Sequence, residues 1–519
     1  MVLGVVDALA RRFFPTQYIV HILVGFVVVV ALRAFSQGKR TNRERDLHAR
    51  TILVTGGFTP LGLILLHNLA ARGAHIIALS PYPVSHPRTS ILVELLRSTT
   101  SNEHIFAEHA DLTSPSSIRR FCTKFLTGDD QRLDAVVFSH EYRHIGAWRW
   151  FRSLTSVVEE EDKQREGAAL ATFLITTLLL PALLVAPVER DIRIVNVVNP
   201  FYAAAASSVS VFSPAMSVFS PSTLTPKPQS KSKSKPLLLA EGTRSLRTLI
   251  LSRHLQRILD SLPAAQVPPT VDGTSAVPVV SSKAQKSNIV AVSVSPGISR
   301  VDTVAQVLNA DWTLADTRFS YFGVFLYIIL QPFLRIFTKS PTMSVQSVLH
   351  VLFLPTPFKI LAQTAFSTSD DASANAKDKP ASKVKTPLDA QLEMPEEVLK
   401  PGALYAECAV VMVRVPVPAD PSASTPSEPT PAPSEKAKKA KGKDNDKAAE
   451  EPLPLSQDDE YGGELVGRLV WEAYEGALKE WEAADPNPVG PEEEEVPKEA
   501  REQVKSQEEV KVEEEKNPY

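Results

Sequence analysis

The sequence predicts an α/β fold with a doubly wound parallel sheet, preceded by one transmembrane helix and followed by a disordered C-terminal tail. Three observations support this fold class. The stretch 51–72 reads as a β-branched run, a Thr-Gly-Gly turn and an apolar pattern with helical spacing. Further short apolar runs alternate with helical patterns, which is typical of a parallel sheet covered on both faces. The chain also has a long apolar stretch near residue 20 and a proline-rich region after residue 416.

The turn after the first strand is the candidate cofactor site. Strand, glycine turn and helix form the opening unit of a Rossmann-like dinucleotide-binding fold. Such a turn needs small residues where the backbone approaches a pyrophosphate, and free N–H groups at the helix start that face the anion. We therefore assign Thr55, Gly56, Gly57 and Gly62 to cofactor binding. Pro60 replaces the middle glycine of a Gly-x-x-x-Gly-x-Gly loop and removes an N–H donor, which weakens the cofactor signal.

Composition limits the number of domains and the class of protein. The chain has 519 residues with 41 prolines, many of them late, against 21 glycines, which indicates one large folded domain plus disordered segments. The net charge of −3 indicates no particular partner. The only cysteines, Cys122 and Cys408, argue against a disulfide scaffold and against a cysteine-rich metal site. A reducing, cytosol-facing domain is the simplest setting.

The N-terminus predicts a membrane anchor. Residues 1–17 form a short leading segment, 18–35 an apolar span, and 36–50 a basic juxtamembrane segment. A buried helix is the alternative, whereas a cleaved signal peptide is disfavoured because no small-residue cleavage site follows. The excess of arginine and lysine after the span places the large domain in the cytosol. The endoplasmic reticulum and the mitochondrial outer membrane are the expected compartments.

The domain from 51 to 415 is predicted to continue with alternating strands and helices. We expect strands at 74–80, 104–110, 133–139, 193–198 and 288–294, and helices at 116–126 and 167–186. Ser114 is the expected N-cap of the first of these helices. The second strand ends in Ser80-Pro81-Tyr82, where an acidic residue would hold an adenosine ribose. Asp111 and Leu112 follow the third strand and join the candidate cofactor residues, although a capping role for Asp111 is the alternative.

The segment Ser139-His140-Glu141-Tyr142-Arg143-His144 could suggest zinc ligands. No further ligand cluster with suitable spacing follows it, so we expect an exposed loop and no metal site.

These residues resemble the short-chain dehydrogenase/reductases. The resemblance covers about 51–415 and depends on five segments in this order: VTGG at the first turn, Asp111-Leu112, LLLPALL on the long helix, RIVNVV as the fifth strand and SPG after the sixth. The anchor and the proline-rich tail make the chain most similar to an uncharacterised fungal, membrane-anchored branch of that family.

The resemblance implies a catalytic Asn-Ser-Tyr-Lys tetrad and NAD or NADP as the cofactor. Counted along this sequence, those four positions fall on Ala168, Asn199, Ala240 and Arg244. All four are replaced, and alanine has no proton to donate. Arginine is a poor substitute for the lysine because its pKa is too high. We therefore expect loss of the usual reductase chemistry, while a retained but altered nucleotide site stays open.

The region after 297 is where this family builds its substrate lid. The apolar segment 319–337 has three interpretations: a lid on the core, a segment dipping into the membrane, or a second span. A helix at 344–354 and a single edge strand at 403–415 are expected to close the domain. Low-complexity insertions are expected near 208–236 and 367–400.

The C-terminal region is predicted to contain one helix between disordered segments. These are a Pro/Ala/Lys-rich linker at 416–460 and an acidic tail at 485–519. An amphipathic helix at 464–483, within the segment 461–484, is expected to dock on the domain or on a partner. The basic tract 436–443 lacks aromatic residues, so we expect no nucleic-acid binding.

Together these features predict a catalytically degenerate binding or scaffold module on a membrane. A lipid-like ligand is expected if 319–337 dips into the membrane, and homodimers are an expectation from the resemblance. The enzyme alternative is an NAD(P)-dependent oxidoreductase acting on a lipid-like carbonyl or alcohol. A third alternative is a tether whose tail helix recruits a partner.

Overall fold

The computed structural model describes 19–128, 132–143, 145–148, 150–151, 155–186, 190–206, 236–266, 287–311, 319–357, 397–415 and 460–485. The predicted segment 1–17 lies outside these residues. So do nearly all of the insertions near 208–236 and 367–400, the linker 416–460 and the tail 485–519.

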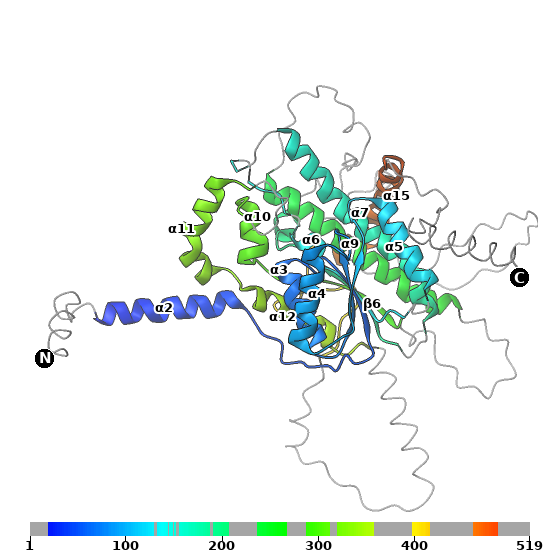
Figure 1. The fold of residues 1–519 in the computed structure, drawn as a ribbon, viewed down its shortest axis with the longest axis horizontal. Helices are drawn as coiled ribbons and strands as arrows, with labels where there is room; N and C mark the ends of the chain where they lie inside the picture. Colours follow the sequence, from blue (N-terminus) through cyan, green and yellow to red (C-terminus); the bar gives the residue numbers. More distant parts are fainter. Residues whose placement is uncertain are drawn as a thin grey trace, which may run out of the picture.

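One eight-stranded sheet organises the fold (Figure 1). Its strands are β1 (Thr51–Thr55), β2 (His75–Ser80), β3 (Ile105–His109), β4 (Ala135–Phe138), β5 (Ile192–Val197), β6 (Ile289–Ser295), β7 (Leu404–Ala406) and β8 (Ala409–Val411). The order is β3-β2-β1-β4-β5-β6-β7-β8, and every pair except β7/β8 is parallel. The order reverses between β1 and β4, where doubly wound sheets bind their ligands. The predicted Rossmann-like sheet is confirmed.

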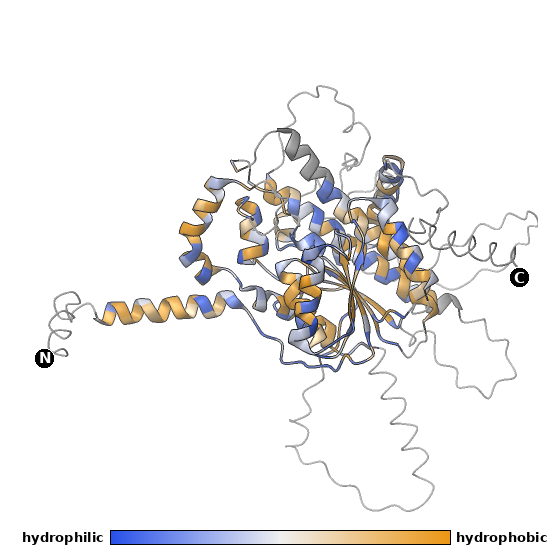
Figure 2. Ribbon diagram, viewed as in Figure 1, coloured by the Kyte–Doolittle hydropathy of each residue, from blue (hydrophilic) through white to orange (hydrophobic). Residues whose placement is uncertain are grey.

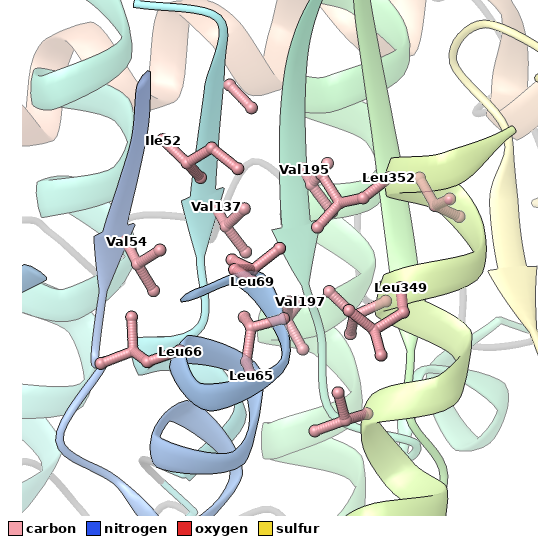
Figure 3. Close-up of a cluster of buried hydrophobic side chains, with 14 of the residues drawn as sticks. Ile52, Val54, Leu65, Leu66, Leu69, Val137, Val195, Val197, Leu349 and Leu352 are labelled. Atoms are coloured by element: carbon pink, nitrogen blue, oxygen red, sulfur yellow. The ribbon is translucent and has the colours of Figure 1, made fainter. Parts of the chain in front are cut away.

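Helices α3 (Pro60–Ala70), α4 (Pro87–Thr100) and α12 (Pro341–Phe353) cover one face of the sheet. Their apolar side chains meet those of the central strands in one cluster. Figure 3 shows Leu65, Leu66 and Leu69 of α3 against Val54 and Val137. Because both faces of a parallel sheet are covered, its strands are apolar on both sides. This explains the continuous apolar runs in the sequence.

The other face is covered by α5 (Pro115–Thr127), α7 (Thr155–Val185) and α9 (Leu237–Gln266). Ser114 caps α5, and its hydroxyl accepts a hydrogen bond from the N–H of Ser117 at 3.4 Å, which confirms the predicted N-cap. Among the described residues, α7 contains one of two stretches long and apolar enough to cross a membrane, but 56% of that stretch is buried. It is therefore a core helix of the domain.

The C-terminal helix α15 (Gly463–Ala483) follows a short 3₁₀ turn, η6 (Glu460–Gly462), and packs outside α7 and α9. Val466, Val470 and Tyr474 are buried there, and the Tyr474 and Phe173 rings lie 5.5 Å apart. Arg257 of α9 donates to the Gly463 carbonyl at 2.9 Å. The sequence left open whether this helix docks on its own domain or on a partner. In the structure it docks on its own domain.

Two apolar helices stand apart from this core (Figures 1 and 2). Helix α2 (Ile19–Gln37) contains the other membrane-length stretch, and none of that stretch is buried. Helix α11 (Tyr321–Phe337) contacts α2, and its Tyr327 packs with Leu308 and Phe151 in a small cluster. Its other side exposes seven large apolar residues: Tyr321, Phe322, Phe325, Ile328, Ile329, Phe333 and Phe337.

The far edge of the sheet differs from the predicted single strand. The segment 403–415 forms a two-strand hairpin, with β7 parallel to β6 and β8 antiparallel to β7. Glu407 and Cys408 make the turn with φ angles of 54° and 59°. Two consecutive residues with positive φ are typical of a tight hairpin turn, which reverses the chain where one continuous strand was expected.

Candidate functional site

The candidate site lies at the carboxyl ends of β1, β4, β5 and β6, and the glycine turn forms its floor. Gly56 has a φ of +65°, and a Cβ at Gly62 would lie 2.2 Å from the Gly56 carbonyl oxygen. The turn therefore needs Gly62 so that α3 can pack against it. Thr59 caps α3, and its hydroxyl accepts from the Gly62 N–H at 3.1 Å. Thr55 and Gly57 complete the turn that the sequence assigned to cofactor binding.

The N-terminus of α3 already has an anionic partner. The Asp302 side chain is fully buried and accepts a hydrogen bond from the Leu61 N–H at 3.4 Å. Asp302 belongs to η5 (Arg300–Val304), a single π-helical turn after β6, and its other oxygen accepts from the Ser299 hydroxyl at 3.1 Å. Burial raises the pKa of Asp302, while Arg143 lowers it.

A dinucleotide diphosphate does not fit this arrangement. Helix N-termini bind phosphate through their free N–H groups. At α3, Pro60 has no N–H, the Leu61 N–H is bonded to Asp302 and the Gly62 N–H is bonded to Thr59. The glycine turn is thus present, but the Leu61 and Gly62 N–H groups at the start of α3 are engaged within the protein.

Three of the four positions that the resemblance assigns to the tetrad lie around one buried region. Ala168 is buried on α7, and its carbonyl lies 2.8 Å from the His140 Nε2. Asn199 is buried after β5 and donates to the Glu241 carbonyl at 3.4 Å. Arg244 is buried on α9, whereas Ala240, one turn earlier, is exposed. The structure brings three of these positions together, but without a hydroxyl or an ammonium group at any of them.

An ion-pair network occupies the α9 side of this region. Glu241 is buried and pairs with Arg244 at 2.7 Å and with Arg165 at 3.3 Å. Its carboxylate also accepts from the Gly146 N–H at 3.1 Å. A buried carboxylate is stable only when it is paired and hydrogen-bonded in this way. Arg244 therefore serves Glu241 and does not take the role of the lysine.

A second polar cluster follows β4, where the sequence predicted an exposed loop. That prediction is wrong: His140 and Glu141 lie in a buried helical turn, α6 (His140–Arg143). The His140 Nδ1 lies 2.7 Å from the Thr55 hydroxyl. Glu141 accepts from the hydroxyls of Thr172 at 2.6 Å and Thr248 at 2.9 Å. Burial lowers the pKa of His140, so the imidazole is neutral near pH 7.

The structure contains no group of three or more His, Cys, Asp or Glu residues able to hold a metal, within the residues it describes.

The adenosine side of the site contains the remaining predicted residues. Asp111 accepts from the Thr113 N–H at 2.9 Å and from its hydroxyl at 2.8 Å, so it stabilises the turn before α5. Leu112 packs against the core beside α5 and α7. At the end of β2, the buried Ser80 accepts from the Tyr82 N–H at 3.1 Å. These contacts match the capping alternative for Asp111.

The sequence reasoning missed Asp302 and the burial of His140 and Glu141. Asp302 is 241 positions from the N–H that it accepts from, so no local pattern connects the two. His140 and Glu141 had one available signal, their place directly after a fully buried strand at the carboxyl edge of the sheet.

No family model matches the chain. An uncharacterized oxidoreductase, pbr1, of Schizosaccharomyces pombe is 25% identical over 173 residues, which are 33% of this chain and 45% of that protein. The uncharacterized oxidoreductase YNL181W of Saccharomyces cerevisiae is 31% identical over 175 residues, 32% and 41% of the two chains. Human retinol dehydrogenase 13 is 26% identical over 166 residues, 32% and 46%. The chain thus spans less than half the length of these curated relatives.

Among solved structures, a short-chain dehydrogenase from Sphingobium yanoikuyae in complex with NADPH aligns with 64% of this chain and 99% of its own. The TM-score is 0.33 and the identity 15%, and the fold assignment does not depend on it. The strand order, the glycine turn and the curated relatives all support the resemblance to the short-chain dehydrogenase/reductase superfamily, and two of these relatives are fungal oxidoreductases.

Proposed function

We propose that this protein is a membrane-anchored member of the superfamily that acts as a binding module and lacks the usual reductase chemistry. One observation carries the proposal: the Asp302 carboxyl group occupies the N-terminus of α3, the place where a dinucleotide diphosphate binds. An anion bound there would compete with a buried carboxylate for a single N–H donor.

The replaced tetrad supports the same proposal. Carbonyl reduction needs a proton donor next to the substrate oxygen. The positions that would supply it carry Ala240 and Asn199, and the position of the lysine carries Arg244 in an ion pair with Glu241. The nearby histidine, His140, is enclosed between Thr55 and the Ala168 carbonyl.

The two apolar helices support a membrane-bound setting. The apolar surface of α2 is fully exposed, and the outer side of α11 exposes large aromatic and aliphatic residues. Exposed apolar surface of this extent marks an interaction site. We propose that α2 anchors the chain and that α11 lies along the same membrane, its inner side on the domain and its outer side in lipid.

A second candidate function is an NAD(P)-dependent oxidoreductase acting on a lipid-like carbonyl or alcohol. The names of the relatives favour it, since two are described as oxidoreductases and one is named for retinol. It requires Asp302 to leave the α3 N-terminus when the cofactor binds, and a proton donor other than the family's tyrosine.

Thermal unfolding of the full chain in detergent, with and without NADH or NADPH, tests both candidates. A ligand at about 100 times its Kd stabilises the native state by about 2.7 kcal/mol. We expect no shift in Tm with either nucleotide at 1 mM (roughly 100 times a Kd of about 10 μM). A clear shift would refute the binding-module proposal and favour the second candidate, which turnover of a lipid ketone would then establish.

Homodimer formation and recruitment of a partner through 464–483 stay predictions. The apolar side of α15 is buried on α7 and α9, so a partner of this helix would meet its polar side.

A further inference from the structure

A basic pocket lies where α2 ends and meets the domain. Its volume is about 690 Å³. Its walls come from the last turn of α2, the segment just after α2, the last turn of α11, the start of α12 with the residue before it, and the start of η5. The lining residues are Arg33, Ala34, Gln37, Gly38, Arg40, Arg300, Arg335, Ser340, Thr342 and Met343.

Four arginines line this pocket and no acidic residue does. In the part of the chain that the structure describes, none of the four forms an ion pair with a carboxylate. The Glu407 side chain lies next to Gly38, and it pairs with Lys339 at 3.2 Å. Four like charges around one cavity repel each other unless an anion binds among them. Guanidinium groups bind phosphate oxygens through paired N–H donors, which makes phosphate the best-matched anion.

Hydrogen bonds between distant segments fix the walls of the pocket. Gln37 donates to the Thr338 carbonyl at 3.0 Å and accepts from the Ser340 N–H at 3.1 Å. The Ser36 hydroxyl donates to the Ile336 carbonyl. Arg40 contacts the Met343 sulfur at 3.2 Å. These contacts join the end of α2 to the end of α11. They hold the segments that carry the four arginines around one cavity.

The position of the pocket indicates where its ligand comes from. It lies at the domain end of α2, next to the end of α11, and both helices have exposed apolar surfaces. Figure 2 shows the apolar character of both helices. If those surfaces lie in lipid, the pocket is at the level of the head groups. Basic pockets beside membrane helices bind anionic head groups in this way.

We propose that this pocket binds the phosphate of an anionic glycerophospholipid whose acyl chains lie along α2 and α11. The site is separate from the nucleotide site and stands whether or not that site binds a cofactor. Its arginines hold the head group, and the apolar faces of the two helices contact the chains. The lipid thus fixes the domain at a defined height on the membrane.

The test uses the full chain in a non-ionic detergent and follows Tm by tryptophan fluorescence. The probes are dioctanoyl phosphatidic acid, dioctanoyl phosphatidylcholine and inorganic phosphate at equal concentrations. We expect phosphatidic acid alone to raise Tm. A basic residue near a lipid surface contributes about 1 kcal/mol, so Arg33→Gln with Arg335→Gln should weaken phosphatidic acid binding roughly 25-fold.

Two control variants separate the pocket from general charge effects. Arg120→Gln removes an exposed arginine from α5, away from α2, and should leave binding unchanged. Arg33→Lys with Arg335→Lys keeps the charges and should retain most of the affinity. The Tm of each variant without lipid reports whether it folds, and Arg33 and Arg335 are both exposed.

Each other outcome overturns the proposal in a distinct way. Equal stabilisation by inorganic phosphate would identify a site for free anions. Equal stabilisation by phosphatidylcholine would show that the apolar faces bind lipid without the arginines. Unchanged phosphatidic acid binding by the double glutamine variant would place the lipid elsewhere.

Discussion

Removing the Asp302 side chain should open the N-terminus of α3 to a dinucleotide. The Asp302 oxygen lies 3.4 Å from the Leu61 nitrogen. A phosphate oxygen accepting from the same N–H would sit about 3 Å from that nitrogen, in nearly the same volume. The two groups therefore exclude each other, and Asp302→Ala removes the competitor.

The electrostatic part of this exclusion has a definite size. If the carboxylate moved aside to about 5 Å from a phosphate charge, their repulsion at an effective dielectric of 20 would be about 3 kcal/mol. This corresponds to roughly a 150-fold loss in affinity. We therefore expect Asp302→Ala to bind NADPH at least about 100 times more tightly than the native chain.

The assay is calorimetric titration of NADPH into the full chain in detergent at pH 7.5, supported by Tm measurements. Burial raises the pKa of Asp302, so keeping its carboxylate charged inside the folded protein costs free energy. Replacing Asp302 by alanine removes that cost, which offsets part of the stability lost with the hydrogen bonds. The variant should unfold within about 2 kcal/mol of the native chain. Asp311→Ala is the matched control, because that buried carboxylate bonds Gln306 and Arg143 and does not reach α3.

Two results would refute this reasoning. Native protein that binds NADPH as tightly as Asp302→Ala would show that the carboxylate leaves the helix without cost. A folded Asp302→Ala protein with no NADPH binding would show that another feature, such as Pro60, closes the site.

Three further predictions concern the packing of the domain. Gly62→Ala places a Cβ 2.2 Å from a backbone oxygen and should lower the free energy of unfolding by more than about 2 kcal/mol in urea, whereas Gly476→Ala, with open space around it, should not destabilise. Tyr474→Ala should lower the free energy of unfolding by about 3 kcal/mol, as other truncations of buried aromatic residues do, and Tyr474→Phe should lower it much less. Equal losses in the two variants would show that the hydroxyl, and not the ring, provides the stability. Burial, followed by Arg257 and Arg468, lowers the pKa of His254 to about 4, below its unfolded value of 6.5. Because the unfolded chain takes up this proton first, the free energy of unfolding should fall as pH drops from 6.5 to 4. After allowing for solvent screening, the fall should be roughly 1–2 kcal/mol. His254→Gln should abolish that fall, and an unchanged pH profile would contradict the assignment.

Local sequence patterns were sufficient for the order and type of the main elements. The run 51–55 and the helical spacing after Pro60 correctly predicted β1 and α3, because strand and helix periodicity depend on residues a few positions apart. Ser114 marked the start of α5 for the same reason. The edge hairpin was missed because its turn residues, Glu407 and Cys408, carry no glycine or asparagine to signal positive φ.

The membrane features were predicted only in part. Composition indicated that 319–337 is apolar, but it left open a lid, a dipping segment and, less favoured, a second span. The structure shows that the side of α11 carrying Tyr327 packs against Leu308 of the domain and that the opposite side is exposed. It also brings Arg33 beside Arg300 and Arg335, residues that are about 300 positions apart in sequence.

The sequence by itself determined the fold class and the glycine turn, since each depends on residue identity or short-range spacing. Only the tertiary structure decided that Asp302 caps α3, that Glu241 neutralises Arg244, and that four arginines surround one cavity. These contacts join residues from separate elements. Their partners are set by how the helices pack on the sheet, and that packing depends on the whole core.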